Sequence, residues 1–281
     1  MNKGNKIIKK IRLNDTVSMM EVEAKDISRV CEPGQFIILR VSELGERIPL
    51  TISDFNREKG TITIIYQIVG LSTNKLDLLE ENDYILDLVG PLGKASEIDQ
   101  NMKKAVVIGG GVGSAIAYPI CKKIKNMGID VISINGFRSK DLVILEEEFK
   151  ENSTLSMIYT NDGSHGYKGF VTDGLEKILS NEKIDCIYTI GPLVMMKAVS
   201  NLSRKYNTKT IASMNPIMID GTGMCGGCRL SVSGKTKFAC VDGPEFDAHE
   251  VDFDELIERN KFYHEIEEKK CNLFKAVKNN G

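Results

Sequence analysis

The first hundred residues alternate short apolar runs with turn-forming residues. The apolar runs are rich in Ile, Val, Leu and Thr, and Gly, Pro, Asn and Asp separate them; they lie at residues 34–41, 47–54, 60–70 and 83–93. Runs of this length at such short spacing are typical of β-strands in an antiparallel barrel. A stretch of mixed polarity at 71–83 predicts a short helix between two of these strands.

The pattern changes near residue 103. Apolar runs at 104–110, 130–137, 156–162 and 185–192 are typical of buried strands, and longer stretches of helical character separate them. In the first of these stretches, Ile116, Ile120, Ile124 and Met127 form one apolar stripe. Further helices are expected at 140–150 and 169–182. Strands that alternate with helices predict a parallel sheet of the doubly wound type.

A Gly- and Cys-rich stretch follows residue 215, and a helical pattern resumes at 251–270 with Asp252 as its expected N-cap. We therefore expect a β-barrel at 1–100, an α/β domain at 101–215, a small segment at 216–250, and a helix with a tail at 251–281.

Composition narrows the class of protein. The chain has 281 residues, 27% of them charged, and a net charge of −2, so nothing indicates binding to nucleic acid or to an anionic membrane. The apolar run at 105–121 holds four glycines and a proline and is too short for a membrane span. Seven cysteines make a disulfide framework unexpected and indicate a reducing cytoplasm, since four of them are scattered: Cys31, Cys121, Cys186 and Cys271.

A glycine cluster follows the first strand of the α/β region and opens a helix. Such a turn lets the backbone approach a pyrophosphate, whose charge is favoured at the helix N-terminus. The spacing Gly109-x-Gly111-x-Gly113 departs from the usual G-x-G-x-x-G, and no acidic residue ends the next strand, where Arg138 is found instead. The sequence favours nucleotide binding here; the alternative is a turn that serves only helix–sheet packing.

The cysteine stretch has the spacing of a metal centre. Cys225 and Cys228 form a C-x2-C pair, Cys240 follows eleven residues later, and Asp220 precedes Cys225 by the x4 spacing of plant-type [2Fe–2S] ferredoxins. Asp220 is therefore the candidate fourth ligand, harder than a thiolate. The alternatives are a structural zinc ribbon, unligated core cysteines, and an Asp220 that only forms a turn.

The segment that contains the cysteines resembles a known protein family. Residues 213–256, "SMNPIMIDGTGMCGGCRLSVSGKTKFACVDGPEFDAHEVDFDEL", resemble the C-terminal signature of the small subunit of NADH-dependent ferredoxin:NADP oxidoreductases, which are electron-bifurcating and sulfide dehydrogenase-like members of the ferredoxin reductase superfamily. The chain also resembles the electron-transfer subunit of dihydroorotate dehydrogenase, in which four cysteines hold the cluster. The first family uses one aspartate and three cysteines, so Asp220 favours it.

The resemblance implies a ferredoxin-reductase-like fold with FAD in the barrel, NAD(H) in the α/β domain and a [2Fe–2S] cluster in the third segment. Carried over onto "RIPLTIS" and "VGLSTNKL", the FAD-binding residues are Arg47, Pro49, Leu50, Thr51, Gly70, Ser72 and Thr73. The nicotinamide motifs carry over onto Gly110, Gly111, Gly113, Arg138, Asp162, Gly163, Gly191, Pro192 and Met195. The cluster ligands are Asp220, Cys225, Cys228 and Cys240.

The activity that the resemblance implies is a flavin and iron–sulfur oxidoreductase subunit. NADH passes a hydride to FAD, single electrons leave through the cluster, and no side-chain acid or base is required. NADP(H) stays open as an alternative because Arg138 suits a 2′-phosphate. Two other functions are alternatives: the electron-transfer subunit of dihydroorotate dehydrogenase, and a zinc-binding interaction module.

The implied partner is a larger subunit, similar to the small subunit of glutamate synthase, that carries FAD and [4Fe–4S] clusters. It forms a heterodimer with the chain and reaches ferredoxin and NADP. We expect the C-terminal helix and tail to help dock it, through Phe253, Leu256, Ile257, Ile266, Leu273 and Phe274. The alternative is a helix that packs on its own domain.

Overall fold

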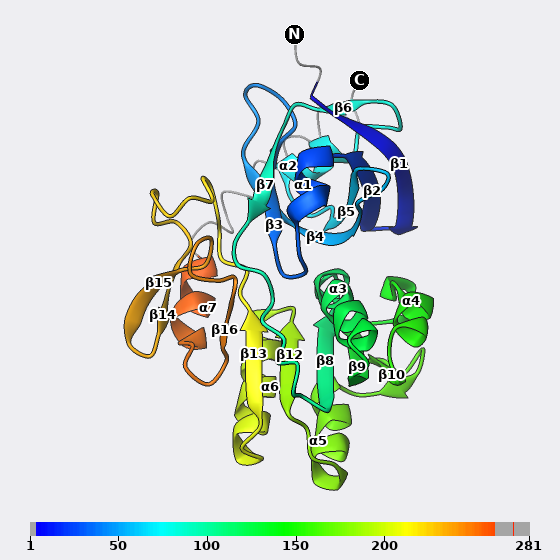
Figure 1. Ribbon diagram of the computed structural model, residues 1–281, viewed down its shortest axis with the longest axis vertical. Helices are drawn as coiled ribbons and strands as arrows, with labels where there is room; N and C mark the ends of the chain where they lie inside the picture. Colours follow the sequence, from blue (N-terminus) through cyan, green and yellow to red (C-terminus); the bar gives the residue numbers. More distant parts are fainter. Residues whose placement is uncertain (1–3, 262–271, 273–281) are drawn as a thin grey trace.

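Two seven-stranded sheets form the framework of the computed structural model, which describes residues 4–261 and residue 272. The first sheet lies in the N-terminal third of the chain and the second in the remainder, and Figure 1 shows the first above the second. A two-stranded hairpin and a C-terminal helix lie beside the second sheet, at the left of the view. No helix in the described part of the chain is long and apolar enough to cross a membrane.

The first sheet is antiparallel and nearly closed. Its order is β6-β1-β2-β5-β4-β3-β7, and its two outer strands, β6 and β7, are separated in the sequence only by Leu86, so the edges of the sheet must come together. The strands are β1 (Asn5–Asn14), β2 (Val17–Glu23), β3 (Phe36–Arg40), β4 (Ile48–Asn56), β5 (Thr61–Gln67), β6 (Tyr84–Ile85) and β7 (Asp87–Leu92). The predicted antiparallel barrel is confirmed.

The interior of the barrel is filled by alternate side chains of its strands. Ile37 and Leu39 of β3 and Ile62 and Ile64 of β5 are fully buried in one apolar cluster. Two short helices complete this part, α1 (Lys25–Val30) and α2 (Leu71–Leu76), and α2 occupies the first half of the predicted helix at 71–83. The strands β1 and β2 were not anticipated from the sequence.

The second sheet has the order β11-β10-β9-β8-β12-β13-β16. Its strands are β8 (Lys104–Gly110), β9 (Asp130–Phe137), β10 (Leu155–Thr160), β11 (Tyr167–Lys168), β12 (Cys186–Ile190), β13 (Lys209–Ser213) and β16 (Glu245–Asp247). All neighbouring strands are parallel except β16, which pairs antiparallel to β13. The order reverses beside β8, so a crevice is expected between the carboxyl ends of β8 and β12.

Helices cover both faces of the second sheet. They are α3 (Gly113–Asn126), α4 (Glu146–Glu151), α5 (Val171–Asn181) and α6 (Leu193–Lys205). Val107 of β8 packs with Ile120 of α3, whereas its neighbour Ile108 packs with Leu175 of α5 and Val199 of α6. Successive side chains of one strand therefore enter opposite layers, which confirms the doubly wound architecture.

Some helical predictions needed correction. The stretch at 140–150 divides into a 3-10 turn (η1, Lys140–Leu142) and the short helix α4, and α6 was not predicted at all. The apolar stripe of α3 is buried at Ile120 and Ile124, but Met127 lies at the end of the helix and is 37% exposed.

The cysteine stretch forms a long loop at the edge of the second sheet. It leaves β13, forms the hairpin β14 (Arg229–Val232) and β15 (Lys235–Phe238), and returns as β16 beside β13. The helix α7 (Phe253–Lys261) follows, and the carboxylate of Asp252 accepts the backbone N–H of Glu255 at 3.0 Å, as an N-cap should. The predicted division of the chain at residues 100, 215 and 250 stays a prediction.

The expected docking role of the C-terminal helix needs correction at Phe253 and Leu256, whereas at the half-buried Ile257 it stays a prediction. Phe253 and Leu256 are 5% and 1% exposed and pack in the apolar cluster that contains Leu230 of β14. These two side chains stabilise the chain's own fold and do not form a free docking face. Ile266, Leu273 and Phe274 lie outside the described residues.

A buried seam joins the barrel, the linker after it, and β16. The Ser96 hydroxyl donates to the carboxyl of Glu245 at 2.6 Å, and the Ser96 N–H donates to the carbonyl of Pro33 at 2.8 Å. Burial raises the pKa of Glu245 to about 7, and the charge of Glu97 adds to the rise. At this seam, therefore, one carboxyl group between the barrel and the α/β sheet is partly protonated near pH 7.

This seam predicts a pH-dependent stability. Because the folded pKa of Glu245 is raised above its unfolded value, the folded state binds the proton more tightly, and stability falls as pH rises from about 4.5 to about 7. Glu245→Gln, which mimics the neutral acid, should stabilise the protein at pH 8 by on the order of 2 kcal/mol and have little effect near pH 4.5. Urea unfolding of both proteins across this range measures the difference; equal differences at both pH values would contradict the assignment.

Candidate functional site

A cleft of about 1010 Å³ separates the barrel from the carboxyl ends of β8 and β12. Its size and its largely apolar lining suit a dinucleotide-sized ligand, and among the described residues that line it only Arg138 carries a charge. The cleft brings together many of the residues predicted from the sequence: Pro49, Leu50, Thr51, Gly110, Gly111, Gly113, Arg138, Gly191, Pro192 and Met195. Their individual roles stay predictions.

The glycines of the turn after β8 allow close approaches that a side chain would prevent. A Cβ at Gly113 would lie 2.6 Å from the carbonyl oxygen of Ile190, so α3 begins directly against the end of β12. A Cβ at Gly110 would lie 2.5 Å from the Met195 sulfur. Gly111 has φ of +55° and faces open space. Two of these glycines thus serve helix–sheet packing, while Gly111 leaves its backbone accessible from the cleft.

The opposite wall of the cleft comes from the barrel. Pro49, Leu50 and Thr51 lie on β4, which pairs with β3, and Phe36 of β3 also lines the cleft. The wall is therefore built on two paired strands and not on a mobile loop. A rigid, mostly apolar surface of this kind is suited to a planar aromatic ring.

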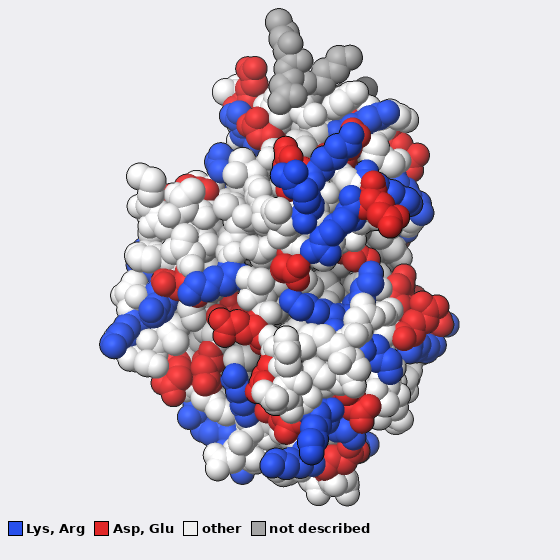
Figure 2. Space-filling view, in the orientation of Figure 1, with Lys and Arg blue, Asp and Glu red and all other residues white. Residues whose placement is uncertain are grey.

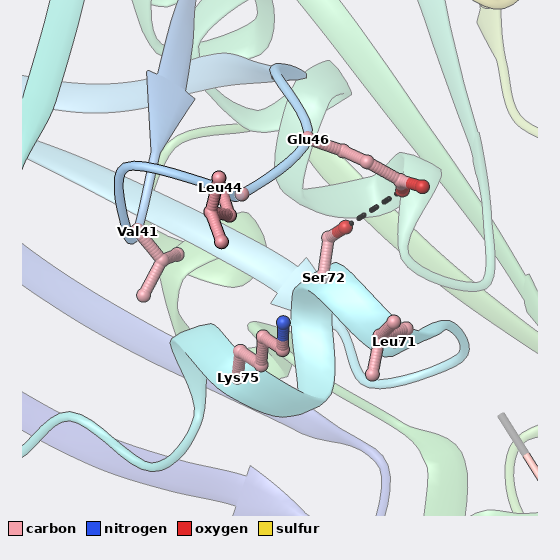
Figure 3. Close-up of a pocket in the computed structure, with 7 residues that line it drawn as sticks. Val41, Leu44, Glu46, Leu71, Ser72 and Lys75 are labelled. Atoms are coloured by element: carbon pink, nitrogen blue, oxygen red, sulfur yellow. Dashed lines mark hydrogen bonds between the residues drawn. The ribbon is translucent and has the colours of Figure 1, made fainter. Parts of the chain in front are cut away.

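The second predicted flavin stretch lies outside this cleft, at the start of α2. The Thr73 hydroxyl accepts the backbone N–H groups of Val69 and Gly70, each at 3.1 Å, and fixes the loop. Ser72 lines a separate pocket of about 190 Å³ and donates to Glu46 at 3.0 Å (Figure 3). Lys75 points toward the same pocket from the next turn of the helix.

The loop after β10 places Asp162 and Gly163 beside the end of β9 but outside the lining of the cleft. The Asp162 N–H donates to the Arg138 carbonyl at 3.3 Å, and the Asp162 carboxylate accepts both the hydroxyl and the N–H of Ser164, which holds its pKa low. His165, for which we predicted no role, forms a 2.8 Å contact with Glu146. Asp162 organises this loop in the structure, and a cofactor contact from it stays a prediction.

Several lining residues were missed by sequence reasoning. Tyr66 of β5 is 1% exposed, lines the cleft, and donates its hydroxyl to Asp77 at 3.3 Å. Burial, and then the charge of Asp77, raise its pKa. Asn161 and Phe170 line the α/β side. Tyr66 lay within a predicted strand, but only the barrel geometry shows which face it occupies.

The cysteine segment carries its thiols in two environments. Cys225 is exposed, whereas Cys228 and Cys240 are 2% exposed and their sulfurs lie 3.2 Å apart. Backbone N–H groups point at two sulfurs: Gly227 donates to Cys225 and Cys240 donates to Cys228, each at 3.4 Å. Burial, together with the neighbouring thiol of Cys228, raises the pKa of Cys240 to about 12.

Asp220 closes the loop that leads to Cys225. Its carboxylate accepts the N–H of Thr222 at 2.9 Å and that of Cys225 at 2.8 Å, and these bonds hold the pKa of Asp220 low. These two hydrogen bonds are the ones expected if Asp220 only forms a turn, which is the alternative that the sequence left open. Since each carboxylate oxygen has two lone pairs, they leave acceptor capacity for a metal.

The candidate ligands thus fall into two groups: the sulfurs of Cys228 and Cys240 lie together, and the Asp220 carboxylate bonds the backbone of Cys225. Within the described residues no group of three or more His, Cys, Asp or Glu side chains is arranged to hold a single metal ion. In a two-iron cluster, by contrast, each iron takes two protein ligands. Ligands in two groups and N–H groups aimed at sulfur therefore fit a [2Fe–2S] cluster better than a zinc ion.

Arg47 precedes β4 but does not line the cleft. Its guanidinium donates to the carbonyl of Ile219 at 3.0 Å and to that of Asp220 at 3.5 Å. Gly221 packs on the same side of the barrel, because a Cβ there would lie 2.7 Å from Ile38 and 2.8 Å from Leu92. In the structure Arg47 joins the barrel to the cysteine segment, and a contact with FAD stays a prediction.

Comparison with known proteins agrees with this geometry. Residues 215–252 match the iron-sulfur cluster binding domain of dihydroorotate dehydrogenase B. A Thermotoga maritima homologue of the dihydroorotate dehydrogenase B (NAD(+)) electron transfer subunit is 45% identical over 94% of this chain and 93% of its own length. The chain belongs to this family of electron-transfer subunits. It is accordingly a subunit of an oxidoreductase.

Other members of the family cover most of the chain. The electron transfer subunit of dihydroorotate dehydrogenase B from Listeria monocytogenes is 35% identical over 88% of this chain and 97% of its own. A solved structure of an NADH-dependent reduced ferredoxin-NADP oxidoreductase, a flavin-based electron-bifurcating enzyme, covers 98% of this chain and 99% of that one, at 41% identity and a TM-score of 0.92.

More distant structures support the fold of this electron-transfer subunit. The ferredoxin reductase of carbazole 1,9a-dioxygenase is 18% identical and covers 73% of the chain with a TM-score of 0.63. An Amycolatopsis cytochrome P450 reductase gives 18% identity and a TM-score of 0.62. The predicted ferredoxin-reductase-like fold is confirmed.

The glycine turn yields a prediction for dinucleotide binding. Gly113→Ala forces the start of α3 away from Ile190, a strain of about 1–3 kcal/mol, so the dissociation constant for NADH should rise at least about tenfold. Gly128→Ala is the control: it has φ of +77° at the other end of α3, with open space around it, and loses stability without a change in NADH affinity. Titration calorimetry measures both; unchanged affinity in Gly113→Ala would refute the assigned role of the turn.

Proposed function

We propose that this subunit oxidises NADH in the cleft and delivers single electrons, through a [2Fe–2S] cluster in the cysteine segment, to a larger flavoprotein partner in a ferredoxin:NADP oxidoreductase. The observation that carries the proposal is the likeness to the NADH-dependent reduced ferredoxin-NADP oxidoreductase over nearly the whole of both chains. Asp220 stands where this branch of the family has an aspartate in place of the first cysteine, and it supports the same choice.

When bound, FAD accepts a hydride from NADH, and a [2Fe–2S] cluster carries one electron at a time. The residues of this chain supply the setting. The turn at Gly110–Gly111 and the N-terminus of α3 favour a pyrophosphate, and Arg138 adds the cationic charge. Pro49, Leu50 and Thr51 form the facing wall, and the apolar lining between the two walls excludes water.

The cleft and the cysteine segment are continuous. Met214, Asn215, Pro216 and Met218 line the cleft, and Asp220 follows two residues after the last of them. A short stretch of chain thus leads from the cleft to the candidate cluster, whose outer ligand, Cys225, is exposed. This arrangement suits a path for electrons from the cleft to the surface of the subunit.

The surface around Cys225 suits the larger partner. Ile217, Ile219 and Met224 are 42%, 52% and 89% exposed, and Val241 is 40% exposed. Figure 2 shows that the surface over this loop, at the upper left of the molecule, is largely free of charged side chains. We infer that the partner, a glutamate-synthase-like subunit with FAD and [4Fe–4S] clusters, covers this surface in a heterodimer and reaches ferredoxin.

The nicotinamide donor is proposed to be NADH and not NADPH. The likeness to the NADH-dependent reduced ferredoxin-NADP oxidoreductase over nearly the whole of both chains supports this choice.

A second candidate is the electron-transfer subunit of dihydroorotate dehydrogenase. The match of residues 215–252 to the iron-sulfur cluster binding domain of dihydroorotate dehydrogenase B favours it. The two functions differ in the reaction of the assembled complex, because only the first couples NADH and reduced ferredoxin to the reduction of NADP⁺. A complex that instead couples NAD⁺ to dihydroorotate would favour the second.

The first experiment is an analysis of the cofactors of the chain purified anaerobically. We expect two iron and two sulfide per chain together with one FAD, since each iron of a [2Fe–2S] cluster takes two of the four candidate ligands. Measurement of iron, sulfide, zinc and flavin, with an absorption spectrum, tests this. Zinc without iron or flavin would overturn the redox proposal and leave a zinc-binding module.

Replacement of Asp220 tests whether it is a ligand or only forms the turn. Asp220→Cys should keep the cluster but change its reduction potential and its spectrum, because a thiolate replaces a harder carboxylate. Asp220→Asn is the control for the turn, since its amide oxygen still accepts one of the N–H bonds from Thr222 and Cys225. A potential and spectrum in Asp220→Cys identical to wild type would show that Asp220 only forms the turn.

A further inference from the structure

The helix α7 contacts the cysteine loop through one arginine. Arg259 donates through Nη2 to the carbonyl of Gly227 at 3.2 Å and through Nη1 to the carbonyl of Arg229. Gly227 lies between Cys225 and Cys228, and Arg229 directly follows Cys228. One planar guanidinium therefore bridges two carbonyls on either side of a candidate ligand.

The backbone that carries Arg259 is itself fixed to the segment. The Glu255 carboxylate accepts the N–H of Ser231 at 3.1 Å, and the Asp252 N–H donates to the Ser231 carbonyl at 2.9 Å. Leu256 packs in the same apolar cluster as Cys228 and Cys240. Figure 1 shows α7 directly beside the β14–β15 hairpin. Arg259 is thus presented to the loop from a rigid support.

We propose that Arg259 is a positioning residue for the metal centre, which fixes the loop between Cys225 and Cys228 and raises the reduction potential of the cluster. The inference rests on the proposed function. Arg259 lies beyond residue 252, where the match to the iron–sulfur domain ends, so the ligand motif does not include it. The geometry of α7 brings it to the site.

The two effects have separate physical causes. Bonds from a charged donor hold the loop more strongly than neutral ones, and they keep the Cys228 thiol directed inward. The Arg259 side chain is only 29% exposed, so its charge is incompletely screened by water. Reduction adds a negative charge to a cluster, and a nearby cation stabilises that state. Glu255, at 3.9 Å from Nη1, offsets part of the effect.

Three variants of the full chain test the proposal. Arg259→Gln removes the charge, and Arg259→Lys keeps the charge without the planar fork. Lys261→Gln removes a charge from the same helix at a side chain that, within the described part of the chain, forms an ion pair with Glu258 and does not contact the cysteine loop. The midpoint potential is measured by a redox titration followed by electron paramagnetic resonance. Alkylation of Cys228 by iodoacetamide is measured in iron-free chain, and the exposed Cys225 calibrates the reagent.

We expect Arg259→Gln to lower the potential by up to about 59 mV, the one-electron equivalent of a tenfold change. Alkylation of Cys228 should become about tenfold faster in Arg259→Gln. Arg259→Lys should have nearly the wild-type potential, but its Cys228 should still be alkylated faster than in wild type. Lys261→Gln should match wild type in both. If Arg259→Gln does not fold, Arg259→Lys still tests the proposal. An alkylation rate of Cys228 equal to that of wild type in Arg259→Lys would overturn the role of Arg259 in fixing the loop.

The inference and the proposed function fail in different ways. Wild-type chain that binds no iron would end the proposed function. Iron-loaded wild type, with Arg259→Gln equal to Lys261→Gln in both potential and alkylation, would overturn only the role of Arg259.

Discussion

The pairing of β13 with β16 is the constraint on which the candidate site depends. The chain leaves the sheet at the end of β13 and returns to it as β16, so residues 214–244 form a closed loop anchored at both ends beside the cleft. The start of this loop lines the cleft, and its middle carries the three cysteines. The two candidate cofactor sites therefore cannot separate without loss of sheet pairing.

Three further contacts fix the loop on its other sides. Gly221 packs against β3 and β7, Arg47 binds the carbonyls of residues 219 and 220 from the barrel, and Arg259 binds those of residues 227 and 229 from α7. The barrel, the sheet and the C-terminal helix thus each hold one side of the segment. A preorganised loop of this kind loses little conformational entropy when it takes up a cluster.

Much of the framework could be predicted from the sequence, because buried strands and the glycine turn have strong local patterns. Tertiary contacts decide what was missed. β1 carries basic residues that pair with acidic partners, such as Lys10 with Glu80, and these mask its strand character. The burial of Phe253 and Leu256 depends on the hairpin beneath α7. Spacing alone also identified the four candidate ligands, but Arg47 and Arg259 reach that loop from distant parts of the chain.

The central claim is that electrons from NADH reach a cluster in this subunit. The most direct measurement is electron paramagnetic resonance of the anaerobic, cofactor-loaded protein before and after addition of NADH. The account predicts that a signal of a reduced [2Fe–2S] cluster develops on addition of NADH, because a one-electron-reduced pair of irons is paramagnetic. Bleaching of the flavin absorbance without any such signal, in protein that contains iron, would contradict it.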